Sequence, residues 1–153
     1  MTTNTTVPPN QAGAPPTKSI TRFFPAVARV LMGLIFLVFG LNGFLNFVPQ
    51  PKTPVPEGAL AFVGAMMKTG YMIRLIAGTQ VLVGVLLLTN CFVPLALAII
   101  APVIVNIIAF HLFLSTLGMP LAVLVLVLEI YLAWVYRHTF RSMLTMRATP
   151  NAT

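Results

Sequence analysis

The chain has 153 residues, of which 58% are hydrophobic and 7% are charged, and its formal net charge is +7. Soluble domains carry about a quarter of their residues as charged side chains, so this composition excludes an ordinary water-soluble fold and predicts a lipid bilayer as the surroundings. The basic residues flank apolar runs instead of forming one patch, which is typical of membrane orientation and argues against a nucleic-acid partner.

The first part of the chain predicts a tail, one membrane crossing and a loop helix. Residues 1–22 are rich in Thr, Pro and Asn, which predicts a disordered cytoplasmic tail. Residues 26–47 form an apolar run with the length of about 20 residues that spans a bilayer. Residues 56–68 then predict a short helix, with Pro56 at its start and Glu57 favourable to its dipole. This helix is too short to span, so we expect it to lie on the outer membrane face.

The next apolar stretch is too long for one crossing and must contain a hairpin. LLLTNCFVP is its central polar interruption, and the proline suits the first turn of a new helix, which predicts helices over residues 71–88 and 92–114. STLGMP predicts the following turn, and residues 119–136 predict a fourth crossing. Residues 139–153 predict a basic cytoplasmic tail.

These elements predict an all-α fold, an integral membrane four-helix bundle over residues 23–138 with a short interfacial helix in the first extracytoplasmic loop. Four crossings place both termini on one side of the membrane. The termini carry six basic residues and the first loop carries three, which favours cytoplasmic termini in a bacterial-type inner membrane.

Each predicted crossing carries a polar group in its outer half. Counted from the outer helix ends, Gln80 and Asn106 lie roughly 12 Å deep and Glu129 roughly 15 Å deep, and the other candidates lie nearer the surface. Polar groups in a bilayer usually face the interior of a bundle. The candidate ligand-binding residues are Gln80, Asn106, His111, Glu129, Asn42 and Arg74.

Helical periodicity predicts which face of each helix points inward. Small residues allow close helix packing in lipid, and the polar residues share faces with them. The four shared faces are Gly33 and Gly40; Ala77, Gln80 and Gly84; Ala98, Pro102, Asn106 and Ala109; and Ala122, Glu129, Ala133 and Tyr136. We expect all four to point into the bundle, and His111 to lie about 140° around its helix from Asn106, at the outer rim.

Each polar residue has a structural interpretation beside a functional one. Glu129 either handles protons or a ligand, or is a neutral acid that hydrogen-bonds Gln80 or Asn106 and sets helix register. Gln80 and Asn106 either contact a ligand or bond across helices, with Asn106 one turn after the helix-bending Pro102. His111 is either a hydrogen-bonding or proton-handling group near the outer surface or an interfacial residue without a role.

The remaining candidates have mainly structural interpretations. Asn42 is as suited to capping and packing as to binding, and Arg74 is an interface anchor that is also placed to neutralise an anionic ligand or the buried acid. His138 lies at the opposite membrane side from His111, which argues against a haem held by two histidines. Cys91 has no partner for a disulfide, and we expect it to be a small hydrophobic residue. No metal-ligand cluster is predicted.

The segments ARVLMGLIFLVFGLNGFLNF, MKTGYMIRLIAGTQVLVGVLLL and FVPLALAIIAPVIVNIIAFHLFL resemble the DoxX-like family of small four-helix membrane proteins. The likeness covers about residues 26–136, and VNIIAFHLFL with VLEIYLAWVYR is its most specific part. The family is named after a thiosulfate:quinone oxidoreductase subunit, and other members are linked to redox and oxidative-stress complexes. The resemblance extends to Arg29, Asn106, His111 and Glu129 without assigning any of them a catalytic role.

Two functions are consistent with these observations. The first is a redox-associated subunit with an outward-facing polar pocket for a quinone head group, covered by the loop helix, with electron-transfer cofactors supplied by other membrane subunits because none is encoded here. The second is a non-catalytic structural or assembly subunit of a larger membrane complex. Many DoxX-like proteins have a lysine in the region of Asn42, and some have an acid in place of Gln80. This chain has an amide at both positions, so it lacks the buried ion pair that a lysine and an acid there could form.

Overall fold

The computed structural model describes residues 23–49 and 53–143; the predicted N-terminal tail and most of the predicted C-terminal tail lie outside them. No strand occurs in the described residues. The helices are α1 (Phe23–Leu45), α2 (Glu57–Lys68), α3 (Met72–Leu88), α4 (Val93–Phe113), α5 (Met119–Val135) and α6 (Arg137–Met143). The predicted bounds of the four long helices and the loop helix differ from these by at most three residues.

The ends of the helices follow from residues with special backbone preferences. The turn before α4 contains Phe92 with φ of 50°, and the turn before α5 contains Gly118 with φ of 89°. Each of these helices has a proline in its first turn, Pro94 and Pro120, where no backbone N–H is needed for the helix. After the break at Tyr136 the chain continues as the short helix α6, which includes the first residues of the predicted C-terminal tail.

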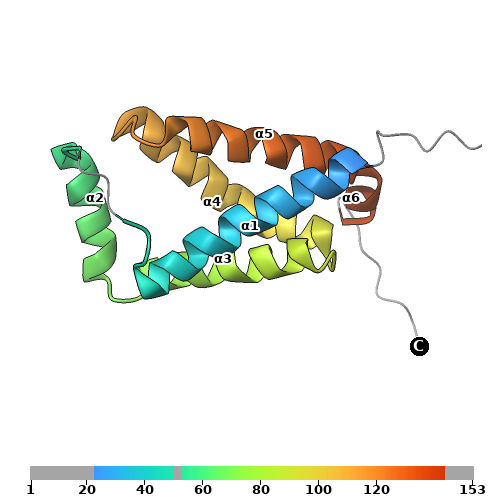
Figure 1. The fold of residues 1–153 in the computed structure, drawn as a ribbon, viewed down its shortest axis with the longest axis horizontal. Helices are drawn as coiled ribbons and strands as arrows, with labels where there is room; N and C mark the ends of the chain where they lie inside the picture. The colour runs from blue at the N-terminus through green and yellow to red at the C-terminus, as the bar shows by residue number, and fades with distance from the viewer. Residues whose placement is uncertain (1–22, 50–52, 144–153) are drawn as a thin grey trace, which may run out of the picture.

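The four long helices contact one another in a closed ring. α1 packs against α3, α3 against α4, α4 against α5, and α5 against α1. The start of α1 and the helix α6 lie at one end of the molecule, which we call the α6 end (Figure 1). α2 lies across the other end, the α2 end, and makes an angle of 90° with α3 (Figure 1). The fully buried core between the long helices includes Met32, Phe36, Leu97, Ile100 and Leu132.

Small residues form the contact between α1 and α3, which we call the α1–α3 seam. A Cβ atom placed on Gly40 would lie 2.7 Å from the backbone nitrogen of Val81, and one placed on Gly84 would lie 2.7 Å from that of Leu37. These distances leave no room for a side chain, so the two backbones are in direct contact. The predicted packing positions Gly33 and Gly40 on α1, and Ala77 and Gly84 on α3, are buried as expected.

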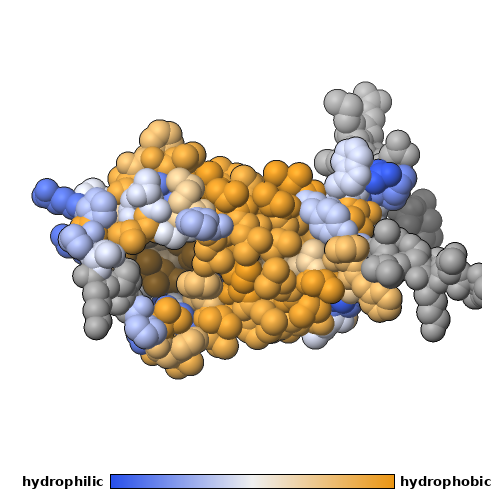
Figure 2. All heavy atoms as spheres, turned by 45° about the horizontal axis from the view of Figure 1, so that its top comes forward, coloured by the Kyte–Doolittle hydropathy of each residue, from blue (hydrophilic) through white to orange (hydrophobic). Residues whose placement is uncertain are grey.

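The outside of the helix ring is apolar. All four long helices expose large hydrophobic side chains, and Figure 2 shows an apolar belt between two more polar ends. Among the described residues, α1 and α4 are each long and apolar enough to cross a membrane, and the bent pair of α2 and α3 is a third candidate. α5 is also apolar, with 17 residues. This surface agrees with the membrane association that the composition predicts.

The predicted inward face of α4 is wrong. The face of α4 that carries Ala98, Pro102 and Asn106 is exposed and does not point into the core of the helix ring. The buried face of α4 instead carries large residues such as Leu97 and Ile104. α4 is apolar on nearly every side, so its sequence contains little contrast between an inner and an outer face. On α5 the prediction holds, since Ala122 and Glu129 are buried.

Candidate functional site

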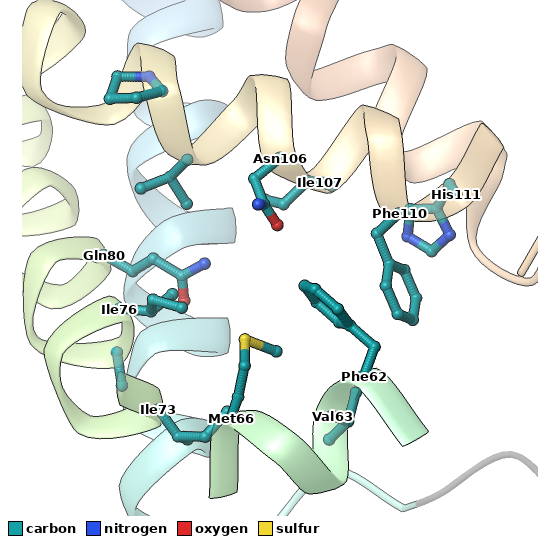
Figure 3. Close-up of a pocket in the computed structure, with 14 residues that line it drawn as sticks. Phe62, Val63, Met66, Ile73, Ile76, Gln80, Asn106, Ile107, Phe110 and His111 are labelled. Atoms are coloured by element: carbon teal, nitrogen blue, oxygen red, sulfur yellow. The ribbon is translucent and has the colours of Figure 1, made fainter. Parts of the chain in front are cut away.

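A cavity of about 440 Å³ lies between α2, α3 and α4 at the α2 end of the ring; we call it the lateral pocket. Figure 3 shows Gln80 on α3 and Asn106 on α4 pointing into it, with Phe62 and Met66 of α2 on the opposite side. Three of its 14 lining residues, Gln80, Asn106 and His111, are polar. An apolar cavity with a few convergent polar groups is the usual form of a small-molecule site.

The two amides in the lateral pocket have free hydrogen-bonding groups. Neither side chain makes a hydrogen bond to another described residue. Each amide has an N–H₂ donor and a carbonyl acceptor, and an amide that faces an apolar space without partners costs free energy unless water or a ligand satisfies it. The predicted hydrogen bond of Glu129 to Gln80 or Asn106 is therefore absent among the described residues.

His111 is held in place at one end of the lateral pocket. Its Nδ1 lies 2.9 Å from the carbonyl oxygen of Ser115, so Nδ1 carries a proton and donates it to this oxygen. The ring also makes an edge contact with Phe110, with centroids 5.3 Å apart. A Cβ on Gly118 would lie 3.0 Å from the imidazole Cε1, so glycine at this turn leaves space for the ring as well as permitting the positive φ.

The sequence separated His111 from Asn106, and the structure places them in one pocket. The angular difference along α4 is compatible with this, because the pocket covers a wide arc of the helix that includes Val103 and Ile107. Helix periodicity describes directions around a single helix, whereas the width of the cavity depends on how far α2 and α3 stand from α4. His111 therefore lies at one end of the same pocket as Asn106 and Gln80, although it points in a different direction around α4.

α2 supplies one wall of the lateral pocket. The rings of Phe62 on α2 and Phe110 on α4 have centroids 5.8 Å apart, and Val63 and Met66 complete the wall. The sequence identified this segment as a covering helix but not these side chains as site residues. Their signal was weak, since nearly every residue of the loop helix is apolar and the contrast between its two faces is small.

The other three candidate residues lie outside the lateral pocket. Asn42 accepts a hydrogen bond from the backbone N–H of Val48 at 2.7 Å, so it caps the end of α1. Arg74 is exposed and donates to the carbonyl of Gly70 at 3.0 Å, within its own turn. Glu129 is buried, and its Oε2 has no hydrogen-bond partner among the described residues.

No group of three His, Cys, Asp or Glu side chains that could hold a metal ion occurs in the part of the chain that the structure describes. His138 lies on α6, at the end of the ring opposite α2 (Figure 1). Cys91 is exposed in the turn between α3 and α4. Arg29 donates a hydrogen bond of 2.6 Å to the carbonyl of Leu87, so its charge lies at the C-terminal end of α3.

Comparison of the chain with protein-family models, with curated proteins and with solved structures finds no match.

Proposed function

We propose that this protein is a four-crossing membrane protein of the DoxX-like kind that binds a quinone in the lateral pocket, as a redox-associated subunit. Four crossings are supported by helix length. α3 and α5 have 17 residues each, α1 has 23 and α4 has 21, and about 17–25 residues span a bilayer. In this arrangement the α2 end faces the outer side of the membrane and both termini are cytoplasmic, as the distribution of basic residues favours.

The observation that carries the quinone proposal is the pairing of two unpartnered amides across an apolar cavity. A quinone head group is a flat apolar ring with two carbonyl acceptors, and the amide N–H₂ groups of Gln80 and Asn106 supply donors for both. The ring itself suits the aromatic and aliphatic wall of Phe62, Met66 and Ile107. Electrons would reach the quinone from a partner subunit in the membrane.

Binding is tested on the full chain purified in detergent and in nanodiscs. We expect quinone to co-purify from native membranes, and a quinone that lacks an isoprenoid chain to raise the thermal unfolding temperature. The double variant Gln80→Leu/Asn106→Leu removes both donor groups at nearly constant volume and should abolish this shift, since each net hydrogen bond contributes about 0.5–1.5 kcal/mol. Val105→Leu, on the exposed side of α4, is the matched control.

The result also separates the two candidate functions. The quinone proposal would be contradicted if quinone did not change the unfolding temperature of the wild type and the double variant still assembled with its partners. Loss of assembly in the same variant, again with no quinone effect, would favour the structural subunit.

A further inference from the structure

A second cavity lies inside the helix ring next to the lateral pocket; we call it the inner cavity. Its volume is about 460 Å³, and it lies between α1, α4 and α5. Its apolar wall is formed by Ile35, Phe36, Phe39, Leu121, Ala122 and Val125. No residue of α2 lines it among the described residues, so it is a separate space from the one that α2 covers.

The two cavities share one wall of side chains. Gln80, Ile107 and His111 line both of them, so a single layer of side chains separates the two spaces. Gln80 makes no hydrogen bond to another described residue, and Ile107 has no polar group that could form one. His111, by contrast, is anchored through Nδ1 to Ser115. The wall therefore has one fixed member and two members that can change rotamer without breaking a hydrogen bond.

The chemistry of the two cavities differs. Asn106 contributes to the lateral pocket, whereas beyond the shared wall the inner cavity presents aliphatic and aromatic side chains. An empty apolar cavity inside a packed bundle costs free energy, because the side chains that line it lose dispersion contacts. A hydrocarbon chain that fills the cavity restores those contacts. The polar groups and the apolar space are adjacent, which matches a ligand with a polar head and an apolar chain.

We propose that the two cavities form one binding site for a single amphipathic molecule with one hydrocarbon chain. The head lies in the lateral pocket, and the chain passes Ile107 into the inner cavity instead of leaving directly into the surrounding lipid. This inference rests on the proposed function, since the head is the quinone of that proposal, and it adds the chain as the part of the ligand that the protein encloses.

The test uses a quinone analogue whose short isoprenoid chain ends in a diazirine, bound to the full protein in nanodiscs and cross-linked by light. We expect cross-links at Ala122 and Val125 on α5 and at Phe36 on α1, the buried residues that line the inner cavity, located by mass spectrometry. Ala122→Phe fills the inner cavity and should remove these cross-links, while a chainless quinone still raises the unfolding temperature. Val123→Phe adds the same ring at the next residue, which is exposed, and should leave the cross-links unchanged.

One further variant and two contrary outcomes make the test decisive. If Ala122→Phe does not fold, Phe39→Trp narrows the same cavity from its half-exposed rim and should reduce the same cross-links. Cross-links confined to α2 or to lipid-exposed residues, together with normal binding of the chainless quinone, would overturn the inference and leave the proposed function intact. Failure of the chainless quinone to bind would overturn both.

Discussion

The two sides of α3 are packed in opposite ways. Toward α1, Gly84 lies against the backbone of Leu37, and no space remains between the helices. Toward α2 and α4, Gln80 and Ile76 face a cavity of about 440 Å³. Both sides belong to one apolar helix, so the contrast comes from side-chain size at a few positions and not from hydrophobicity.

This contrast explains how an open pocket can persist in a small bundle. A cavity tends to be closed by movement of its walls when they are free to move. The α1–α3 seam fixes α3 through backbone contacts, so α3 cannot shift toward α4 without losing its packing against α1. α2, held by a 90° bend to α3, then forms the remaining wall as a separate element.

The largest effect is expected from Gly40→Val, which places a branched side chain in the α1–α3 seam. Its Cβ would lie 2.7 Å from the backbone nitrogen of Val81 and 2.9 Å from the carbonyl oxygen of Ala77, so the helices must separate. We expect a loss of about 1–3 kcal/mol or more in the free energy of unfolding, as for other overpacked cores. Unfolding in mixed detergent micelles measures this loss.

Gly64→Ala is the control for this prediction. Gly64 is helical, and a Cβ there would meet no atom within 4 Å. Alanine is favoured over glycine inside a helix by about 0.5–1 kcal/mol, so α2 should be unchanged or slightly more stable. Equal destabilisation by the two substitutions would show that the seam has no special role.

Glu129→Leu tests a buried polar group that faces neither the lateral pocket nor the inner cavity. Since its Oε2 lacks a partner among the described residues, removing the carboxyl should raise the free energy of unfolding by about 1–3 kcal/mol. Thermal unfolding measures the change, with Val127→Leu on the exposed side of α5 as the control. A clear loss of stability would contradict the view that the buried carboxyl destabilises the bundle.

Gly118→Ala tests the wall that the two cavities share. Its φ of 89° is costly for any residue with a Cβ, and that Cβ would press on the His111 ring. We expect a loss of about 1–2 kcal/mol in stability from the left-handed backbone conformation. The imidazole signals in NMR spectra should shift as the contact with Ser115 weakens. Unchanged imidazole signals would mean that the ring is held independently of the turn.

The smallest effect is expected from Phe62→Ala, on the α2 side of the lateral pocket. An aromatic pair contributes about 0.5–1.5 kcal/mol beyond its buried area, so losing the contact with Phe110 should loosen α2. Hydrogen exchange should become faster in α2 and stay unchanged in α1 and α3. Faster exchange in the α1–α3 seam would contradict the view that α2 is a separate element.

Helix positions followed from the sequence because the chain encodes them locally. Prolines and glycines mark the turns, and the apolar runs have the length of a membrane crossing. α6 was missed because RHTFRSM is short and polar and carries no hydrophobic period that distinguishes it from a tail. Gln80 and Asn106 were identified as site candidates because an amide in an apolar helix is rare at any orientation.

The sequence by itself therefore determined the number, order and approximate ends of the long helices, and which side chains are polar within them. The tertiary structure decided which of those polar groups share a space. It brought Asn106 and His111 together with Gln80 around the lateral pocket, and it left Glu129 buried elsewhere. The physical reason is that α4 and α5 are apolar on nearly all sides, so the choice of inner face depends on how side chains of neighbouring helices fit together.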